Sequence, residues 1–266
     1  MKTLGLASIN VVLLLTLAAT LCYGSQGYEY IVDEHTTGLW HMNEGEGMEA
    51  IDASPNGFNG AIQGVAQWDE EGWKKEGEPG HSFLFNGSTG IIIGNIPELI
   101  NPESNSITIE AWVYPENLGG WHVIVTHWSG PEGAYHFACD NALPQCSINT
   151  ENGKSSLRGA AIAPQDWYHI AVTYDSDSGD MTIYVDGAVA AENPGHGGKM
   201  KNLNTGFNVV IGSKHDSSFS WLGMMDEVRI SNIARAPEEL SPNLTAPQSV
   251  SPHGNLVLTW GAIKEK

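Results

Sequence analysis

Two adjacent carboxylates, Asp226 and Glu227, stand in an otherwise apolar, strand-like segment near the end of the chain. Paired carboxylates can hydrolyse glycosides: a retaining enzyme places two of them about 5 Å apart across one sugar, as nucleophile and acid/base. On a β-strand, however, adjacent residues point to opposite faces, and only residues i and i+2 share a face. If this segment is a strand, the two carboxylates cannot both address one substrate.

The segment 107–116, ITIEAWVYPE, is the second place where a catalytic carboxylate could stand. Glu110 shares its face with two aromatic residues, and Glu116 follows a proline, so no carboxylate array forms. The sequence contains neither Gly-x-Ser-x-Gly nor His-Glu-x-x-His, the signatures of esterase and zinc-peptidase sites. We therefore predict a protein that is not an enzyme and has no catalytic residues. A divergent glycosidase acting through Glu110 or Glu227 is the alternative.

The remaining pattern is that of strands and turns. Short runs rich in Val, Ile, Thr and aromatic residues recur, each bounded by Gly, Pro, Asn, Asp or Ser. In the segment 167–190, period-two alternation, a DSDSG turn and the pair Asp186-Gly187 predict an antiparallel meander. No long amphipathic helix separates the strands, and one short helical turn is expected at APEEL, where Pro237 is the first helical residue. These patterns predict an all-β fold of two antiparallel sheets.

The composition and the N-terminus indicate export. Residues 1–24 have the layout of a signal peptide, with one Lys before an apolar run too short to span a bilayer, so we predict a secreted or periplasmic protein without a membrane span. One domain is expected over residues 25–240, followed by a tail of unknown role at 241–266. The formal net charge of −19 repels nucleic acid, anionic lipid and sulfated glycans, and favours neutral ligands or divalent cations.

Two cysteines, Cys139 and Cys146, remain after removal of the signal peptide. They flank a short loop between two strand-like runs, and export permits their oxidation. We predict a disulfide that closes this hairpin and stabilises it by roughly 2–3 kcal/mol.

Five segments, in this order, resemble laminin-G-like jelly-roll domains of the concanavalin A-like lectin/glucanase superfamily. They are GLWHMNEGEG…IDASPNGFNGAI, HSFLFNGSTGIIIG, SITIEAWVYP, WYHIAVTYD…MTIYVDGAV and FSWLGMMDEVRISNIARAPEEL. The resemblance covers the chain from about Gly38 to Leu240. It implies that the two sheets form a concanavalin A-like jelly-roll sandwich with a role in recognition.

The resemblance also implies a structural calcium site, because related domains hold Ca²⁺ with an Asp of the last strand and oxygens of an N-terminal loop. Here the ligands would be Asp226, Asp52 and Asn56. Strict alternation places Asp226 toward the apolar side, where it needs a partner. In the alternative, Asp226 accepts backbone N–H bonds from that loop. Glu227, on the opposite face with Arg229, is expected to form a cross-strand ion pair.

A recognition domain of this kind needs exposed aromatic rings with polar groups near them, because the C–H face of a neutral sugar packs on rings. Trp121, His122 and Trp128 are the candidates for carbohydrate binding, and Trp68 and Trp73 come next. Other tryptophans, on regular strands, are expected in the core: Trp112 and Trp167. The expected partner is a neutral glycan or a cell-surface or extracellular protein. A scaffold domain without a sugar site stays open, and the oligomeric state is not indicated.

Overall fold

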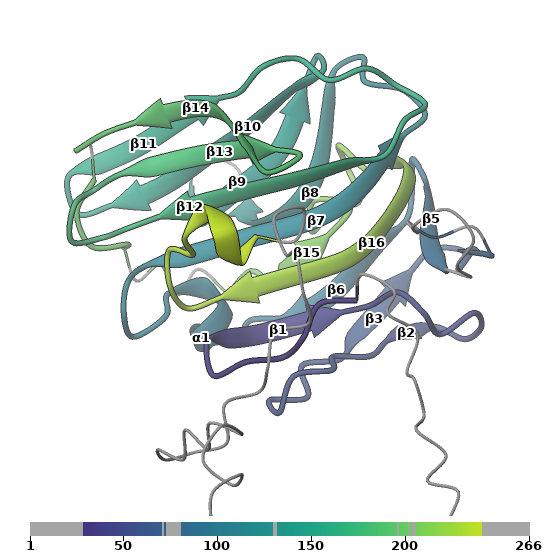
Figure 1. Cartoon of the computed structure of the whole chain (residues 1–266). Coiled ribbons are helices and arrows are strands. Elements are labelled where there is room, and N and C mark those ends of the chain that lie inside the picture. The colour runs from purple at the N-terminus through teal and green to yellow at the C-terminus, as the bar shows by residue number, and fades with distance from the viewer. Residues whose placement is uncertain are drawn as a thin grey trace, which may run out of the picture.

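The computed structural model describes most of the chain between the predicted signal peptide and the predicted tail, namely residues 29–70, 72, 81–129, 132–195, 197–201, 203 and 206–240. The predicted segments 1–24 and 241–266 therefore lie outside the described residues. Two antiparallel sheets pack face to face in this part of the chain (Figure 1). The predicted all-β, two-sheet jelly-roll sandwich is confirmed.

Sheet A is built from strands with the bounds β1 Thr36–Trp40, β4 Trp68–Asp69, β5 Ser82–Asn86, β7 Ile107–Pro115, β12 Tyr168–Tyr174, β13 Met181–Val185, β14 Ala188–Asn193 and β16 Leu222–Ser231. Their spatial order is β14–β13–β12–β7–β16–β5–β4. The long strand β16 pairs with β5 through its first half and with β1 through its second half. The N-terminal strand therefore lies beside the C-terminal one, as Figure 1 shows.

Sheet B is built from strands with the bounds β2 Glu49–Ala50, β3 Gly60–Gln63, β6 Gly90–Gly94, β8 Trp121–Ser129, β9 Glu132–Asp140, β10 Leu143–Thr150, β11 Gly153–Arg158 and β15 Val209–Ile211. Their spatial order is β11–β10–β9–β8–β15–β6–β3–β2. The consecutive strands β8 to β11 form a meander, so four successive segments of the chain lie next to one another at one end of this sheet.

The core lies between the sheets and follows the period-two pattern of the strands. In β7, Ile109, Ala111 and Val113 enter the main apolar cluster, so the residues between them face outward. Phe83 and Phe85 of β5 pack edge to face at 4.8 Å between ring centroids. Burial of such side chains, at about 25 cal/mol per Å² of apolar surface, is the main contribution that holds the sheets together.

The predicted meander at 167–190 is confirmed as strands β12, β13 and β14. The tight turn between β13 and β14 is Asp186-Gly187, with φ of 51° and 74°. Positive φ at both positions is the turn geometry that matches the twist of a hairpin, and Gly adopts it without steric cost.

Two short helical elements occur in the described residues. The predicted turn near the C-terminus is confirmed as a 3-10 helix, η1 Pro237–Glu239, and the carboxylate of Glu239 accepts the Ala236 N–H at 2.8 Å. A four-residue helix, α1 Pro97–Ile100, was not predicted from the sequence. No helix among the described residues is long and apolar enough to cross a membrane.

The predicted hairpin between Cys139 and Cys146 forms, but the predicted disulfide does not: both thiols are free and buried. Cys139 of β9 lies opposite Pro144 of β10, and Cys146 lies opposite Phe137. The two cysteines are thus diagonal neighbours, about 7–8 Å apart between Cα atoms, which is too far for an unstrained disulfide. Burial raises the pKa of Cys139 to about 12, so this thiol is unreactive at neutral pH.

Candidate functional site

The carboxylate doublet lies at a β-bulge. Asp226 pairs with Trp112 of β7, and Arg229 pairs with Glu110, so β16 has one more residue than its partner between these positions. The bulge includes Glu227, whose φ is 50°. Asp226 therefore faces outward with Trp112, while Val228 and Ile230 face the core. Glu227 also lies on this outer face, since it binds Tyr30, which packs with Trp112. The predictions that Asp226 shares a face with Val228 and Ile230, and that Glu227 points to the face opposite to Asp226, are therefore wrong because the alternation shifts at the bulge.

Glu227 binds the N-terminal segment rather than Arg229. Its carboxylate accepts the backbone N–H of Tyr30 at 2.8 Å and contacts Nδ1 of His41 at 2.8 Å. Burial lowers the pKa of His41, but the hydrogen bond and charge of Glu227 outweigh it and raise this pKa above its usual value. The partner of Glu227 in the expected cross-strand ion pair is His41, the residue after β1, which pairs with β16.

Arg229 instead binds Glu110, the other candidate for catalysis. Its Nε and Nη2 donate to one carboxylate oxygen of Glu110 at 2.8 and 2.6 Å, and Nε2 of His169 contacts the other oxygen at 3.0 Å. Burial raises the pKa of Glu110, but Arg229 and His169 outweigh it and lower this pKa to about 2. The guanidinium also stacks over the ring of Tyr30, 4.5 Å from its centroid.

None of these carboxylates lies in an open groove. Glu110 is fully buried, and Asp226 and Glu227 are each 3% exposed. The segment around Tyr30 packs on Trp112, and the residue after η1, Leu240, packs on β12 and β13. In Figure 1, η1 is the yellow turn that crosses in front of sheet A. Glu227, which binds Tyr30, and Arg229, which stacks on Tyr30 and donates to the carbonyl of Glu239, therefore hold these covering segments on the outer face of sheet A.

The carboxylate of Asp52 organises the loop after β2. It accepts four hydrogen bonds, two on each oxygen, from the backbone N–H groups of Leu39, Ser54 and Phe58 and from the Ser54 hydroxyl. Asn56 donates its amide N–H to a backbone carbonyl of β1 at 2.9 Å. A carboxylate offers about four lone-pair sites, so Asp52 has none left for a cation in this arrangement.

These three residues consequently do not fit the calcium site that the sequence suggests. Asp226 pairs with Trp112 of β7 on one side of β16, whereas Asp52 bridges to Trp40 of β1 on the other side of β16. The described residues contain no group of three or more His, Cys, Asp or Glu side chains placed to hold a metal ion. Calcium binding stays a prediction, and it would require the hydrogen bonds of Asp52 to be exchanged.

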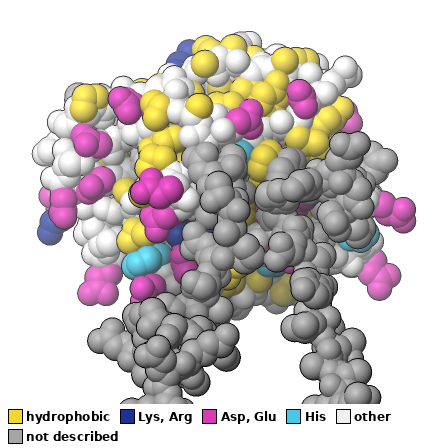
Figure 2. Space-filling model, viewed as in Figure 1, with side chains coloured by type: hydrophobic (Ala, Val, Ile, Leu, Met, Phe, Trp, Pro, Cys, Tyr) yellow, Lys and Arg dark blue, Asp and Glu magenta, His cyan; other side chains and the backbone are white. Residues whose placement is uncertain are grey.

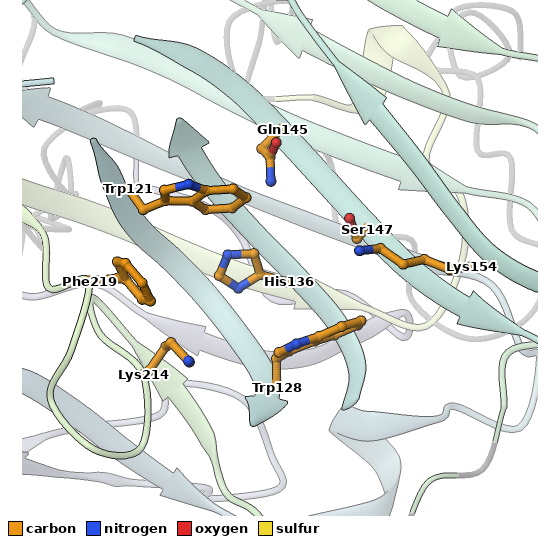
Figure 3. Close-up of a pocket in the computed structure, with 8 residues that line it drawn as sticks. All are labelled: Trp121, Trp128, His136, Gln145, Ser147, Lys154, Lys214 and Phe219. Atoms are coloured by element: carbon orange, nitrogen blue, oxygen red, sulfur yellow. The ribbon is translucent and has the colours of Figure 1, made fainter. Parts of the chain in front are cut away.

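The outer face of sheet B carries a hollow of about 220 Å³ (Figure 3). Two tryptophans from β8, Trp121 and Trp128, flank His136 of β9, with ring centroids 5.4 and 6.4 Å from the imidazole. Phe219, which is 48% exposed, lies beside Trp121 with its centroid at 6.3 Å. The remaining lining residues come from β10, β11 and the loop after β15: Gln145, Ser147, Lys154 and Lys214.

A bulge in β8 places both tryptophans on one face. Trp121 and Trp128 are seven positions apart, and strict alternation would turn them to opposite sides of the sheet. Between Val123 and Val125 the register with β9 shifts by one residue, and both Ile124 and Val125 enter the core. The phase of the strand changes there, so both indole rings face the hollow.

His136 is a neutral group at the centre of the hollow. Burial, together with the charges of Lys214 and Lys154, lowers its pKa to about 4. Its Nδ1 lies 3.0 Å from the hydroxyl of Thr126, which itself donates to the carbonyl of Tyr135 at 3.3 Å. When the Thr126 hydroxyl donates to Tyr135, Nδ1 is the donor to that hydroxyl, and Nε2 then keeps a lone pair that can accept a hydrogen bond from a ligand hydroxyl.

Two further polar side chains are oriented by their neighbours on β11. The carbonyl of Gln145 accepts Nε of Arg158 at 2.9 Å, and the amide nitrogen is turned toward His136 in Figure 3. The hydroxyl of Ser147 lies 2.9 Å from that of Ser156. The hollow thus combines aromatic faces with a hydrogen-bond donor, an acceptor and a hydroxyl. Sequence analysis missed these groups, because the register of β8 to β11 brings them together.

Of the three predicted sugar-binding residues, Trp121 and Trp128 line the hollow and His122 does not. His122 points away from the hollow: its two ring nitrogens contact the carbonyls of Ser220 and Gly119 at 3.1 and 3.0 Å. The next candidate, Trp68, packs edge to face on Phe83 of sheet A, and Trp73 lies outside the described residues. The tryptophans expected in the core, Trp112 and Trp167, form a second apolar cluster on the outer face of sheet A.

Residues 85–241 match a laminin G-type family described as the concanavalin A-like lectin/glucanases superfamily. The chain belongs to this family. The resemblance found in the sequence is thus confirmed, and the match includes β16 with its doublet and every residue that lines the hollow. A comparison with curated proteins found no match.

Solved structures with the same fold include several binding domains. Domain 4 of AbnA, an extracellular GH43 arabinanase from Geobacillus stearothermophilus solved with arabinotriose, aligns with a TM-score of 0.57 at 17% identity, over 78% of this chain and 97% of that domain. The binding domains of Paraclostridial Mosquitocidal Protein 1 and of botulinum neurotoxin serotype G align with TM-scores of 0.58 and 0.56 at 14% and 13% identity. In both cases 77% of this chain and 50% of the toxin domain are covered, so the chain spans about half the length of these domains.

Proposed function

We propose that this protein is an exported, non-catalytic recognition module that binds carbohydrate in the hollow around Trp121 and Trp128. The observation that supports this most directly is the pair of indole rings on either side of a neutral imidazole. Sugar rings pack their C–H faces on such aromatic surfaces, and the adjacent polar groups pair with the hydroxyls. A volume of about 220 Å³ suits one or two sugar units, with the remainder of a longer glycan outside.

The solved relatives are consistent with this role. Domain 4 of AbnA was solved with arabinotriose, and the two toxin domains are named as binding domains. The burial of Glu110, Asp226 and Glu227, which leaves them inaccessible to a glycan, supports a non-catalytic role. The same hollow would serve adhesion to a cell surface, because adhesion needs recognition without turnover.

The test is binding of the protein spanning residues 25–266 to a panel of oligosaccharides, followed by melting curves, because a ligand that binds the folded state raises its stability by mass action. We expect saturable binding to at least one glycan, and we expect Trp121→Ala to weaken it. If no oligosaccharide of the panel binds, the alternative of a scaffold domain without a sugar site is favoured. Hydrolysis of a polysaccharide that is abolished by Glu110→Gln or Glu227→Gln, in a variant that circular dichroism shows to be folded, would overturn the non-catalytic proposal.

A further inference from the structure

The charge around the hollow is opposite to that of the whole chain. The sequence has 31 Asp+Glu against 12 Lys+Arg, a formal net charge of −19. Among the described residues that line the hollow, however, two are lysines and none is a carboxylate. Figure 2 shows the molecule from the side of sheet A, where acidic side chains are spread over the visible surface and basic ones are few.

The exposed cations of the described residues gather on the outer face of sheet B. Lys154 of β11 pairs with Asn149 of β10, on the same face as Ser147. On the other side of β10, Met200 bridges to Thr150 and enters the core, so Lys199 and Lys201 turn to the outer face.

The other cations among the described residues are arginines, and each of them is paired with a carboxylate. Arg158 of β11, on the same face as Lys154, binds Asp140. The two others are buried: Arg229 binds Glu110, and Arg235 binds Asp33 at 2.7 Å. The lysines of the outer face of sheet B are therefore the exposed positive charges that could meet a ligand.

Lys154 and Lys214 direct their charges into the hollow. The Nζ of Lys154 lies 5.1 Å from the centroid of Trp128, and that of Lys214 lies 5.1 Å from the centroid of Phe219. In Figure 3 both ammonium groups are turned toward the space between the rings. Neither lysine forms an ion pair with a described carboxylate. Asp216, two residues after Lys214, accepts the N–H and O–H of Ser218, and these hydrogen bonds together with the charge of Lys214 lower the pKa of its carboxyl.

We propose that the sugar bound in this hollow carries a negative charge, as a uronic acid does, and that Lys154 and Lys214 bind its anionic group. This inference rests on the proposed carbohydrate site and specifies its ligand. A carboxylate held by two ammonium groups forms charge-assisted hydrogen bonds, roughly twice as strong as neutral ones. The overall negative charge does not prevent this, because at physiological salt charges beyond about 8 Å are largely screened and the nearest groups dominate.

The test compares ligands that have the same sugar backbone but differ in charge: trigalacturonate and its fully methyl-esterified form. A sulfated galactan oligosaccharide and its desulfated form make a second pair, which distinguishes a carboxylate from a sulfate as the anion. We expect the acid to bind at least about 10-fold more tightly than the ester, or the sulfated form more tightly than the desulfated one, and we expect added salt to weaken the charged ligand selectively.

Two variants assign the effect to the lysines. Lys154→Gln and Lys214→Gln should each weaken binding of the charged ligand by about 5-fold, with a much smaller effect on its neutral counterpart. Val189→Glu is the matched control: it makes the chain more negative by the same one unit, at an exposed position of β14 in sheet A, and should leave binding unchanged.

The outcomes separate this inference from the proposed function. If the charged and neutral forms bind equally well and Trp121→Ala abolishes the binding of both, the inference that the ligand is anionic is wrong. The proposed carbohydrate site would then still hold. Binding of the charged form that the lysine variants do not weaken would also overturn the inference. If no form binds, and Trp121→Ala changes nothing across the panel, the carbohydrate site itself is contradicted.

Discussion

On the outer face of sheet A, aromatic rings, a histidine and charged groups are buried beneath segments of the chain itself, whereas on the outer face of sheet B the same kinds of side chain line a hollow. Tyr30 and Trp112 surround His169 in sheet A, and each polar partner there is another protein group. In sheet B, Trp121 and Trp128 surround His136, with positive charges turned toward the open space.

The difference lies in how each site satisfies its polar groups. Buried ion pairs must be complete, because a charge left unpaired in the interior is costly. The carboxylate of Glu110 is satisfied by Arg229 and His169 and lies beneath the covering segments, so it is not available to a ligand. The site around His136 has two ammonium groups that form no ion pair with a described carboxylate, and its imidazole faces the hollow. We therefore propose that the outer face of sheet A has a structural role and that the outer face of sheet B serves recognition. The following substitutions would test these two roles.

The largest effect is expected from Glu110→Gln. The substitution leaves Arg229 buried without its countercharge and should lower the free energy of unfolding by about 3–5 kcal/mol, measured by urea denaturation at pH 7. Because Glu110 has a pKa of about 2 in the folded protein, its contribution is present above the unfolded pKa and is lost as the pH falls toward 2. The destabilisation should shrink over that range.

Glu116→Gln is the matched control for Glu110→Gln, since Glu116 follows β7 and is exposed. It should change stability by less than about 0.5 kcal/mol. A Glu110→Gln protein as stable as the unmodified one would mean that the buried network does not support sheet A.

Trp121→Ala should act on binding rather than on the fold. Removal of an aromatic ring from the centre of a binding surface typically costs a factor of about 10 or more in affinity, which calorimetry with the best glycan of the panel would measure. Trp68→Ala removes an equally half-buried indole from sheet A, where it packs on Phe83. Both variants should lose about 1–2 kcal/mol of stability, but Trp68→Ala should bind normally. Equal loss of binding in the two would contradict the assignment of the site.

His41→Gln should produce a smaller effect that depends on pH. The pKa of His41 is raised in the folded protein, so its pairing with Glu227 stabilises fully below the unfolded pKa of about 6.5 and is lost as the pH rises through the folded pKa. The variant should be less stable by about 1 kcal/mol at pH 6, and the difference should shrink toward pH 9. His35→Gln, at a more exposed histidine, is the control. A difference that grows with pH would contradict this pairing.

Calcium should have the smallest effect. The hydrogen bonds of Asp52 leave no lone pair for a cation, so calcium or EDTA should shift the melting temperature by less than about 1 °C. A rise of several degrees that Asp52→Ala abolishes would restore the calcium site expected from the sequence.

The bulges account for most of the differences between prediction and structure. The sequence predicted the strand that contains Asp226 and Glu227, but not the extra residue that reverses its faces. Trp121 and Trp128 were chosen because they flank loops, and they meet only because of the bulge at Ile124. A bulge has no reliable signature in the local sequence, since it is set by how a strand fits its neighbours.

The sequence by itself determined the strands, the tight turns, the sandwich and the family, because these depend on alternation, on turn residues and on ordered motifs. Only the tertiary structure decided which carboxylates are buried, that Cys139 and Cys146 lie diagonally, and that Lys154 and Lys214 approach the aromatic rings. Such contacts join residues that are distant in the chain, and their distances depend on strand register, which a shift of one residue reverses.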